Sequence, residues 1–167
     1  ALGVTPGVWV APFIARPGTP FLTEHPEAFV HTASGELAIA GYNWGGPYYA
    51  LDTTHLLAQE YLRDLAQSLV DAGIGYVKAD FVNAAAIDGV RHDGQVTGDD
   101  AYVIGSRLFR QALGEDVYLL GSGALIVPSI GIYDGIRVGC DVAPIWKNYA
   151  TDDRSDAEAR NAFMTSV

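Results

Sequence analysis

The chain is poor in cysteine and in cationic residues. Its single cysteine, Cys140, excludes an intrachain disulfide and a cysteine-based metal site, and this weakly favours a cytoplasmic location. Ten Lys and Arg stand against twenty Asp and Glu, which gives a formal net charge of −10 at pH 7. Because such a surface repels polyanions, nucleic acid and anionic membranes are not expected as partners, and a neutral or cationic ligand fits better.

Long hydrophobic runs are also missing. No apolar run reaches the roughly 20 residues of a membrane span, and no basic-then-apolar leader opens the chain. The four histidines share no metal-ligand spacing, so neither a metal nor another cofactor is expected: His25, His31, His55 and His92. Of the 167 residues, 49% are hydrophobic and 18% are charged, which is typical of one globular domain. The chain begins almost at once in an apolar run and stops inside an expected helix, so we expect the middle of a larger domain.

Short apolar runs alternate with helical patterns. Strands are expected at 8–13, 74–81, 117–120 and 136–142. This alternation indicates right-handed crossovers and a parallel sheet. No glycine-rich phosphate loop follows a strand, which disfavours a nucleotide-binding sheet. Two connections, 14–50 and 81–98, are long enough to carry function. We therefore predict an α/β segment with its site at the carboxyl ends of the strands.

Three helices are expected between and after these strands. Leu57, Tyr61, Leu65 and Leu69 recur at helical spacing, after Asp52 or Thr53 as a cap. A second helix begins at a box formed by Thr97 and Asp100 and ends at Gly114. A third is expected to open at the capping box 155–158. Asp52 is predicted to be a cap rather than a ligand.

The strand at 74–81 ends in a charged pair. Because side chains alternate along a strand, Tyr76, Lys78 and Asp80 share one face. The other face is apolar and suits packing under helices: Val77, Ala79 and Phe81. Spacing alone leaves open whether Lys78 and Asp80 form a structural ion pair or a reactive site.

The last expected strand repeats this arrangement. Arg137, Gly139 and Asp141 share one face by alternation, while Cys140 faces the helix side. Two strands would then end in carboxylates, each preceded by a cation. Paired carboxylates are what glycoside hydrolysis needs, one as nucleophile and one as acid and base. The alternative is a pair of unrelated ion pairs at strand ends.

Five blocks occur in order along the chain: GVWVAPF (7–13), YALD (49–52), YVKADF (76–81), LLGSGA (119–124) and RVGCDVAP (137–144). In this order they resemble the melibiase-type alpha-galactosidases, glycoside hydrolase family 36 and its clan relatives. No single block is specific, but together they span nearly the whole chain. The resemblance implies a (β/α)8 barrel of which residues 1–167 are the central part, with these blocks at its third to sixth strands.

The resemblance also implies roles for residues. Asp80 matches the nucleophile and Asp141 the acid/base of a retaining double displacement, while Lys78 and Arg137 would hold sugar hydroxyls and developing charge. Ser122 stands where relatives often have cysteine, and Cys140 where they often have proline. Ser122 can still bind a sugar hydroxyl, so these departures concern the galactose preference more than the reaction class.

Aromatic residues near these blocks are candidate walls for a sugar, because their faces stack on apolar sugar faces. Trp9, Trp44 and Trp146 are the candidates; Tyr48 and Tyr49 are favoured less, because they can simply pack the loop. The expected partner is an oligosaccharide or glycoside, and a homo-oligomer of the full-length parent is left open.

Two other functions fit the residues. Lys78 could be the Schiff-base amine of a barrel aldolase, with Asp80 as its acid/base partner. The chain could also be a carbohydrate-binding remnant without catalysis. Retention of both carboxylates and both cations counts against a decayed site.

Overall fold

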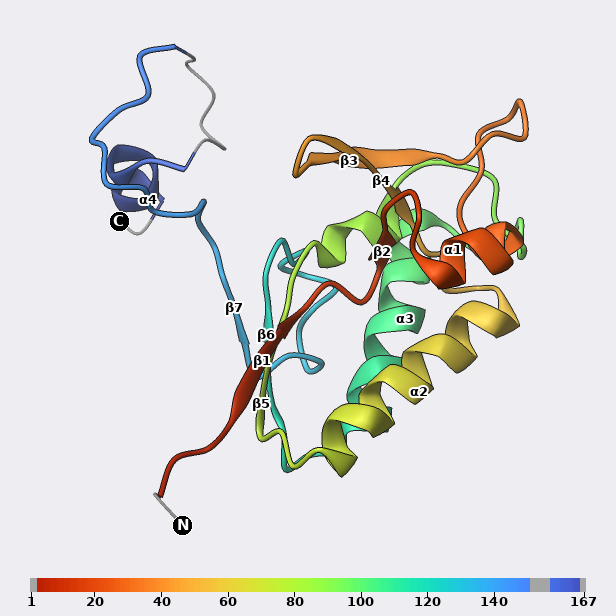
Figure 1. The fold of residues 1–167 in the computed structure, drawn as a ribbon, viewed down its shortest axis with the longest axis horizontal. Coiled ribbons are helices and arrows are strands. Elements are labelled where there is room, and N and C mark those ends of the chain that lie inside the picture. The colour runs from red at the N-terminus through yellow and green to blue at the C-terminus, as the bar shows by residue number, and fades with distance from the viewer. Residues whose placement is uncertain (1–2, 151–156, 166–167) are drawn as a thin grey trace. The chain divides into compact units, whose positions relative to one another are not determined.

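The computed structural model describes residues 3–150 and 157–165 of the chain. They form two compact units, Ala1–Ile136 and Arg137–Val167. Within the described residues, no helix has the length and apolar character needed to cross a membrane. The first unit contains both sheets and the two long helices (Figure 1).

Four parallel strands form the sheet of the first unit. They lie in the order β1 (Gly7–Val10), β5 (Tyr76–Ala79), β6 (Tyr118–Gly121) and β7 (Gly135–Ile136). Trp9 lies beside Lys78 in register, and Lys78 lies beside Leu120. The predicted parallel α/β arrangement is confirmed, and it places the ends of β1, β5 and β6 next to one another.

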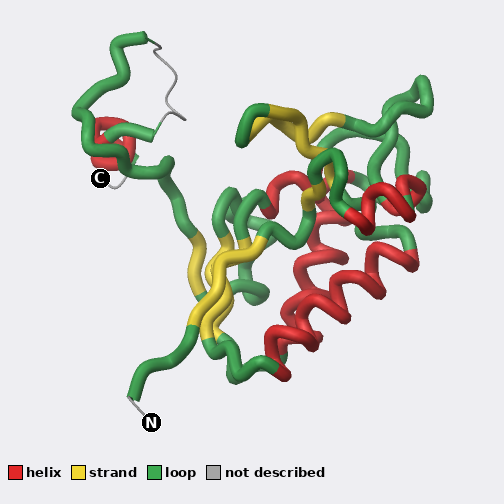
Figure 2. The backbone as a smooth tube through the Cα atoms, in the orientation of Figure 1, coloured by secondary structure: helices red, strands yellow, loops and turns green. Residues whose placement is uncertain are grey.

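Helices α2 (Leu56–Asp71) and α3 (Gly98–Leu113) pack on one side of this sheet (Figure 2). Val77, Ala79 and Leu119 face them and are fully buried. On the opposite face Tyr76 and Tyr118 stack with ring centroids 5.4 Å apart, and both are partly exposed. The alternation predicted for the Asp80 strand is therefore confirmed from 76 to 79.

The ends of the two long helices are set by different caps. Thr97 caps α3 by accepting a hydrogen bond from the Asp100 backbone N–H, and Gly114 ends that helix at a φ of 78°, both as predicted. The predicted cap of α2 is wrong. His55 Nδ1 accepts from the Leu57 backbone N–H, while Asp52 is buried and accepts from the backbone N–H of His92.

The expected irregular connection 14–50 is instead ordered around a second sheet. Antiparallel strands β2 (Ile14–Ala15), β4 (Gly46–Ala50) and β3 (Ile39–Asn43) form it in that order. Short helices α1 (Pro20–Glu24) and η1 (Pro26–Ala28) precede β3. The β3–β4 hairpin turns at two residues with positive φ, Trp44 and Gly45, as type I′ turns do.

Two further predictions need correction. The connection 81–98 contains a 3₁₀ helix, η2 (Val82–Ala86). The strand expected at 136–142 ends at Ile136, because only Gly135 and Ile136 pair with β6. Alternation therefore does not fix the faces of residues 137–142, Cys140 included. Of the predicted capping box, 155 and 156 lie outside the described residues; Glu158 precedes α4 (Ala159–Met164) without a side-chain cap.

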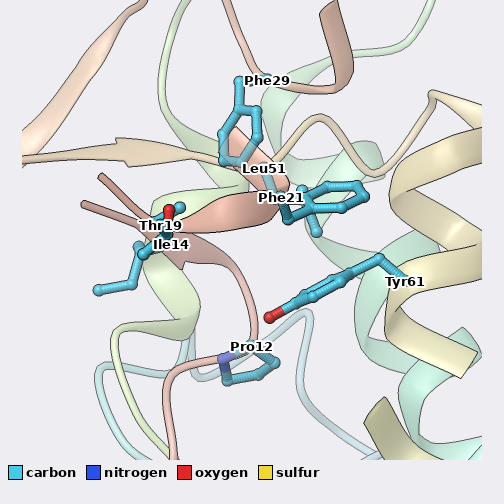
Figure 3. A pocket seen from close by; sticks show the side chains of 8 residues that line it. Pro12, Ile14, Thr19, Phe21, Phe29, Leu51 and Tyr61 are labelled. Carbon is cyan, nitrogen blue, oxygen red and sulfur yellow. The ribbon is translucent and has the colours of Figure 1, made fainter. Parts of the chain in front are cut away.

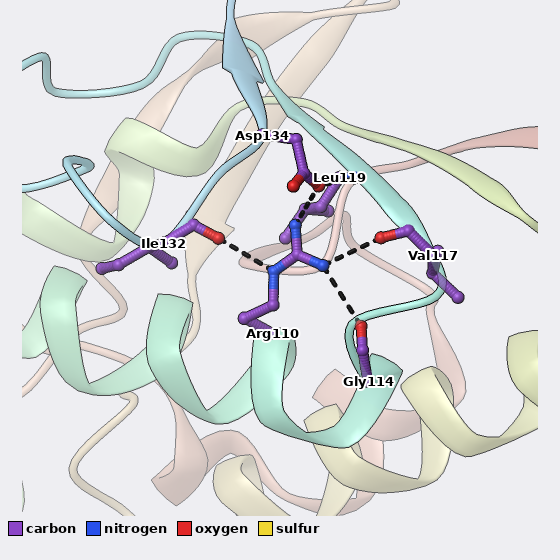
Figure 4. Close-up of polar contacts among 6 residues, drawn as sticks. All are labelled: Arg110, Gly114, Val117, Leu119, Ile132 and Asp134. Carbon is purple, nitrogen blue, oxygen red and sulfur yellow. Dashed lines mark hydrogen bonds and ion pairs between the residues drawn. The ribbon is translucent and has the colours of Figure 1, made fainter.

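Arg110 ties α3 to the end of the sheet opposite the strands' carboxyl ends (Figure 4). Its guanidinium donates to the carbonyls of Ile132, Gly114 and Val117 at 2.9, 3.2 and 2.8 Å, and pairs with Asp134. Asp134 also accepts the backbone N–H of Leu119 on β6 at 2.7 Å. This network fixes β6, the strand that Ser122 follows.

Candidate functional site

Asp80 lies directly after β5, and three donors surround its carboxylate. The indole Nε1–H of Trp9 donates to Oδ2 at 2.9 Å, and the backbone N–H of Phe81 donates to Oδ1 at 2.9 Å. The Lys78 Nζ lies 3.6 Å from Oδ2. The Asp80 side chain is mostly buried, with 15% of its surface exposed. Register between β1 and β5 thus brings the indole, the ammonium and the carboxylate together.

The surroundings favour the charged form of this carboxylate. Burial by itself raises the pKa of Asp80. The Ser122 hydroxyl, the Trp9 indole, the Phe81 N–H and the Lys78 ammonium outweigh burial and lower the pKa below its ordinary value. Asp80 is therefore an ionised, hydrogen-bonded carboxylate at neutral pH, as a nucleophile must be.

Ser122 lies at the end of β6, beside Asp80. Its backbone N–H donates to the Ala79 carbonyl at 2.8 Å, and its carbonyl accepts from Val82 at 3.3 Å. The side chain is fully buried, and Oγ makes no hydrogen bond of standard geometry, although the hydroxyl lies close enough to lower the pKa of Asp80. A buried hydroxyl left in this condition can turn toward a ligand.

Aromatic rings form a wall next to Asp80. Trp44 packs edge-on against Trp9 and Phe81, with ring centroids 6.3 and 5.3 Å apart, and Tyr48 contacts Phe81 at 5.3 Å. Burial, and secondarily the charge of Asp80, raise the pKa of Tyr48. Trp9 and Trp44 are each about half exposed, so the wall has an open side. We call Trp9, Trp44, Tyr48 and Phe81 the aromatic wall.

Phe81 was predicted on the helix-facing side of the strand, and that prediction is wrong. Its backbone is left-handed, with a φ of 54°, which breaks the alternation after Asp80 and turns the ring toward Trp9. Sequence reasoning therefore missed Phe81 as part of the wall. The available signal was an aromatic residue directly after a strand-end carboxylate.

The other predicted site residues lie in the second unit. Arg137 and Asp141 form an ion pair four positions apart, not through strand alternation, and the Asp141 side chain is mostly exposed. Trp146 is 63% exposed and its carbonyl accepts the backbone N–H of Arg160 at 3.0 Å. The predicted pairing of Asp141 with Asp80 stays a prediction.

Two other depressions in the first unit contain none of the predicted site residues. A small cavity is lined mainly by apolar side chains, and its polar groups are the hydroxyls of Thr19 and Tyr61 (Figure 3). His31, His55, His92 and Asp52 line an open depression. Among the described residues, no group of three or more His, Cys, Asp or Glu side chains is arranged to hold a metal ion.

No family model matches the chain. It does align with the alpha-galactosidase of Thermus thermophilus solved in complex with stachyose, at 35% identity over 98% of the chain and with a TM-score of 0.88. This chain is alpha-galactosidase-like. The resemblance predicted from the sequence blocks is thereby confirmed. The chain spans only 35% of the Thermus protein, about a third of its length.

More distant structures share the fold of this alpha-galactosidase-like chain. A family GH36 alpha-galactosidase of Geobacillus stearothermophilus, in complex with 1-deoxygalactonojirimycin, matches 98% of the chain at 16% identity and a TM-score of 0.62. The chain covers 22% of that protein. A GH31 sulfoquinovosidase from E. rectale matches 87% at 18% identity and a TM-score of 0.65, and the chain covers 23% of it.

Proposed function

We propose that this alpha-galactosidase-like segment carries the nucleophile and the acid/base of a retaining glycoside hydrolase that acts on alpha-galactosides. The observation that carries the proposal is the Asp80 carboxylate, which ends a parallel strand, holds an indole N–H at 2.9 Å and has a lowered pKa. In parallel α/β barrels this end of the strands is where catalysis occurs. Similarity to a protein solved with stachyose supports the galactoside class.

In this mechanism Asp80 attacks the anomeric carbon and forms a glycosyl ester, while the glycosidic bond breaks and its oxygen leaves with a proton from Asp141. Asp141 then takes a proton from water as the water oxygen attacks the anomeric carbon, and the bond to Asp80 breaks to release the sugar with retained configuration. Asp80 suits the first role because its donors stabilise the ionised form without protonating it. Retention requires the two carboxylates about 5–5.5 Å apart.

The remaining residues would bind the sugar. Lys78 has its ammonium at the Asp80 carboxylate and 29% of its side chain exposed, so it can donate to sugar hydroxyls and offset charge. Ser122 can also donate to a sugar hydroxyl, because its Oγ makes no hydrogen bond of standard geometry. We assign Arg137 to developing charge beside Asp141, and Trp44 and Trp146 to stacking on sugar faces.

The Schiff-base alternative gains no support from the geometry. The Lys78 Nζ lies 3.6 Å from the Asp80 carboxylate, a partner that favours the ammonium form, and an ammonium has no lone pair with which to attack a carbonyl. Borohydride trapping with a carbonyl substrate should therefore label nothing. In a carbohydrate-binding remnant, Asp80→Asn would leave binding intact in a protein that was already inactive.

We further propose that the segment needs the rest of a barrel. A closed barrel of this kind takes about eight strands, and the first unit pairs four. Among the described strands, β1 and β7 are at the edges of that sheet, and each pairs on one side only. The isolated 167-residue chain should then self-associate or exchange its edge-strand amides quickly, and turn over no galactoside at an ordinary rate.

The experiment that tests the acid/base assignment uses the longer protein in which the barrel is complete. Asp141→Ala should lower the rate about 10²–10⁴-fold for a galactoside with a poor leaving group. The loss should shrink for p-nitrophenyl alpha-galactoside, whose leaving group needs little proton assistance. Equal losses for both substrates would reject Asp141 as the acid. Glu115→Ala, at an exposed carboxylate before β6, is the control and should leave both rates unchanged.

A further inference from the structure

Trp44 has an unusual backbone for a bulky residue. Its φ of 49° is in the left-handed region, which glycine and asparagine adopt readily and tryptophan rarely does. It occupies the first central position of the β3–β4 turn, where hairpins of this type favour Asn, Asp or Gly. Backbone conformations of this kind persist only where neighbouring groups hold them, and they concentrate at functional sites.

Two contacts hold the strained residue. The Asn43 Oδ1 accepts the Trp44 backbone N–H at 2.8 Å. Arg16, which follows β2, donates from Nη2 to the Trp44 carbonyl at 3.0 Å. The same guanidinium lies over the Trp44 ring, with Cζ 5.8 Å from the centroid, within the range of a cation–π contact. Arg16 therefore holds both the backbone and the ring of Trp44.

Arg16 has no competing ionic role in the described part of the chain. No carboxylate there pairs with it, and its Nε is buried without a hydrogen-bond partner. Its own carbonyl is fixed by the backbone N–H and hydroxyl of Thr19, at 3.1 and 2.9 Å. The contacts of the Arg16 guanidinium are therefore with Trp44 and not with a carboxylate, as they would be in a structural ion pair.

We propose that Arg16 is a positioning residue for the sugar site: it holds Trp44 against Trp9 and Phe81, and so keeps the aromatic wall formed before a glycoside binds. The contacts run from Arg16 to Trp44, from Trp44 to Trp9 at 6.3 Å between ring centroids, and from Trp9 to Asp80 at 2.9 Å. This inference rests on the proposed function, because it assigns the wall to a glycoside. A wall that is already ordered costs less entropy on binding.

Arginine suits this task better than lysine. Its planar guanidinium can donate to a carbonyl from one edge and stack on an indole with its face, whereas an ammonium does one or the other. Arg16→Lys should therefore keep the charge but lose either the hydrogen bond to the Trp44 carbonyl or the contact with its ring. Arg16→Ala should lose both contacts. Arg63→Ala is the matched control, because Arg63 is an exposed arginine on α2 whose contact is Gln59 on the same helix.

The test uses the longer protein in which the barrel is complete, labelled with 5-fluorotryptophan and followed by ¹⁹F NMR. Trp44→Phe assigns the signal of Trp44, and Trp146→Phe assigns that of Trp146. Arg16→Ala should shift and broaden the Trp44 signal and leave Trp146 unchanged, with Arg16→Lys between it and the unmodified chain. A Trp44 signal that is identical in Arg16→Ala, Arg16→Lys and the unmodified protein would contradict the claim that Arg16 positions Trp44.

The second readout is binding of 1-deoxygalactonojirimycin, measured by titration on the same signals. Arg16→Ala should weaken binding about tenfold, equivalent to about 1.4 kcal/mol, and Arg63→Ala should not change it. Equal affinity for Arg16→Ala and the unmodified complete protein, with a shifted Trp44 signal, would overturn the role in binding. No binding by the unmodified complete protein would overturn the proposed function and the binding role with it. That failure is recognisable because Arg16→Ala would still alter the Trp44 signal.

Discussion

Two arginines at opposite ends of the strands show how differently the chain uses the same side chain. Arg110 donates to three carbonyls, pairs with Asp134, and is 8% exposed. Arg16 donates to one carbonyl and leaves Nε buried without a partner. The first network is complete and serves stability. The second is incomplete, surrounds a strained Trp44, and lies where the rings lead to Asp80. The comparison therefore separates an arginine that stabilises the sheet from one that positions an aromatic ring.

The largest effect on stability should come from breaking the complete network. Arg110→Met should lower the free energy of unfolding by about 3 kcal/mol, because it leaves Asp134 and several carbonyls without their donor. Chemical denaturation followed by circular dichroism measures the change. Arg107→Met, on an exposed position of the same helix, should change the free energy by less than about 0.5 kcal/mol. Equal losses of free energy in Arg110→Met and Arg107→Met would contradict a stabilising role for the Arg110 network.

A second effect depends on pH and is shared by the two ends. Burial raises the pKa of Asp134, but the Leu119 N–H and the Arg110 guanidinium outweigh it and lower the pKa. A carboxylate with a lowered folded-state pKa stabilises the fold above its unfolded pKa, about 3.9, and loses that contribution as the pH falls through the folded value. The pKa of Asp80 is also lowered, so Asp80 has the same effect on stability. The free energy of unfolding should therefore decrease as the pH is lowered below about 4.

Two substitutions test this pH dependence. Asp134→Asn and Asp80→Asn should each flatten the acid limb, and Asp88→Asn, on an exposed turn, should leave it unchanged. Denaturation midpoints measured from pH 5 to pH 2.5 would decide. An acid limb as steep in Asp134→Asn and Asp80→Asn as in the unmodified protein would contradict the assignment.

The smallest expected effect concerns the strain at Trp44. Trp44→Ala and Trp44→Asn both remove the ring, but asparagine tolerates a left-handed backbone and alanine does not. Trp44→Asn should therefore be about 1 kcal/mol more stable to denaturation than Trp44→Ala. Both should weaken glycoside binding to the same extent. Equal stability of the two variants would mean that the left-handed backbone at 44 carries no cost.

Much of the first unit could be predicted from the sequence, because its signals are local. The strand that ends at Asp80 alternates cleanly, and Thr97 with Asp100 forms the box that opens α3. These patterns depend on a few neighbouring residues and need no knowledge of the rest of the fold.

The errors arose where distant contacts override local preference. The β3–β4 hairpin was missed because tryptophan at position 44 disfavours the turn that the Arg16 and Asn43 contacts hold. Phe81 left its predicted face because its backbone turns left-handed against Trp9. The last strand was drawn too long because apolar residues at 138–142 suggest pairing, while β6 pairs only as far as Ile136.

The central claim is that Asp80 is the nucleophile, and covalent trapping tests it most directly. An activated fluoro-galactoside forms a slowly hydrolysed bond to the attacking carboxylate, so the complete protein should gain one sugar, mapped by peptide mass spectrometry to Asp80. Prior addition of 1-deoxygalactonojirimycin should block the label, and Asp80→Asn should abolish it. A label on Asp141 or on any other residue, or a label that persists in Asp80→Asn, would contradict the account.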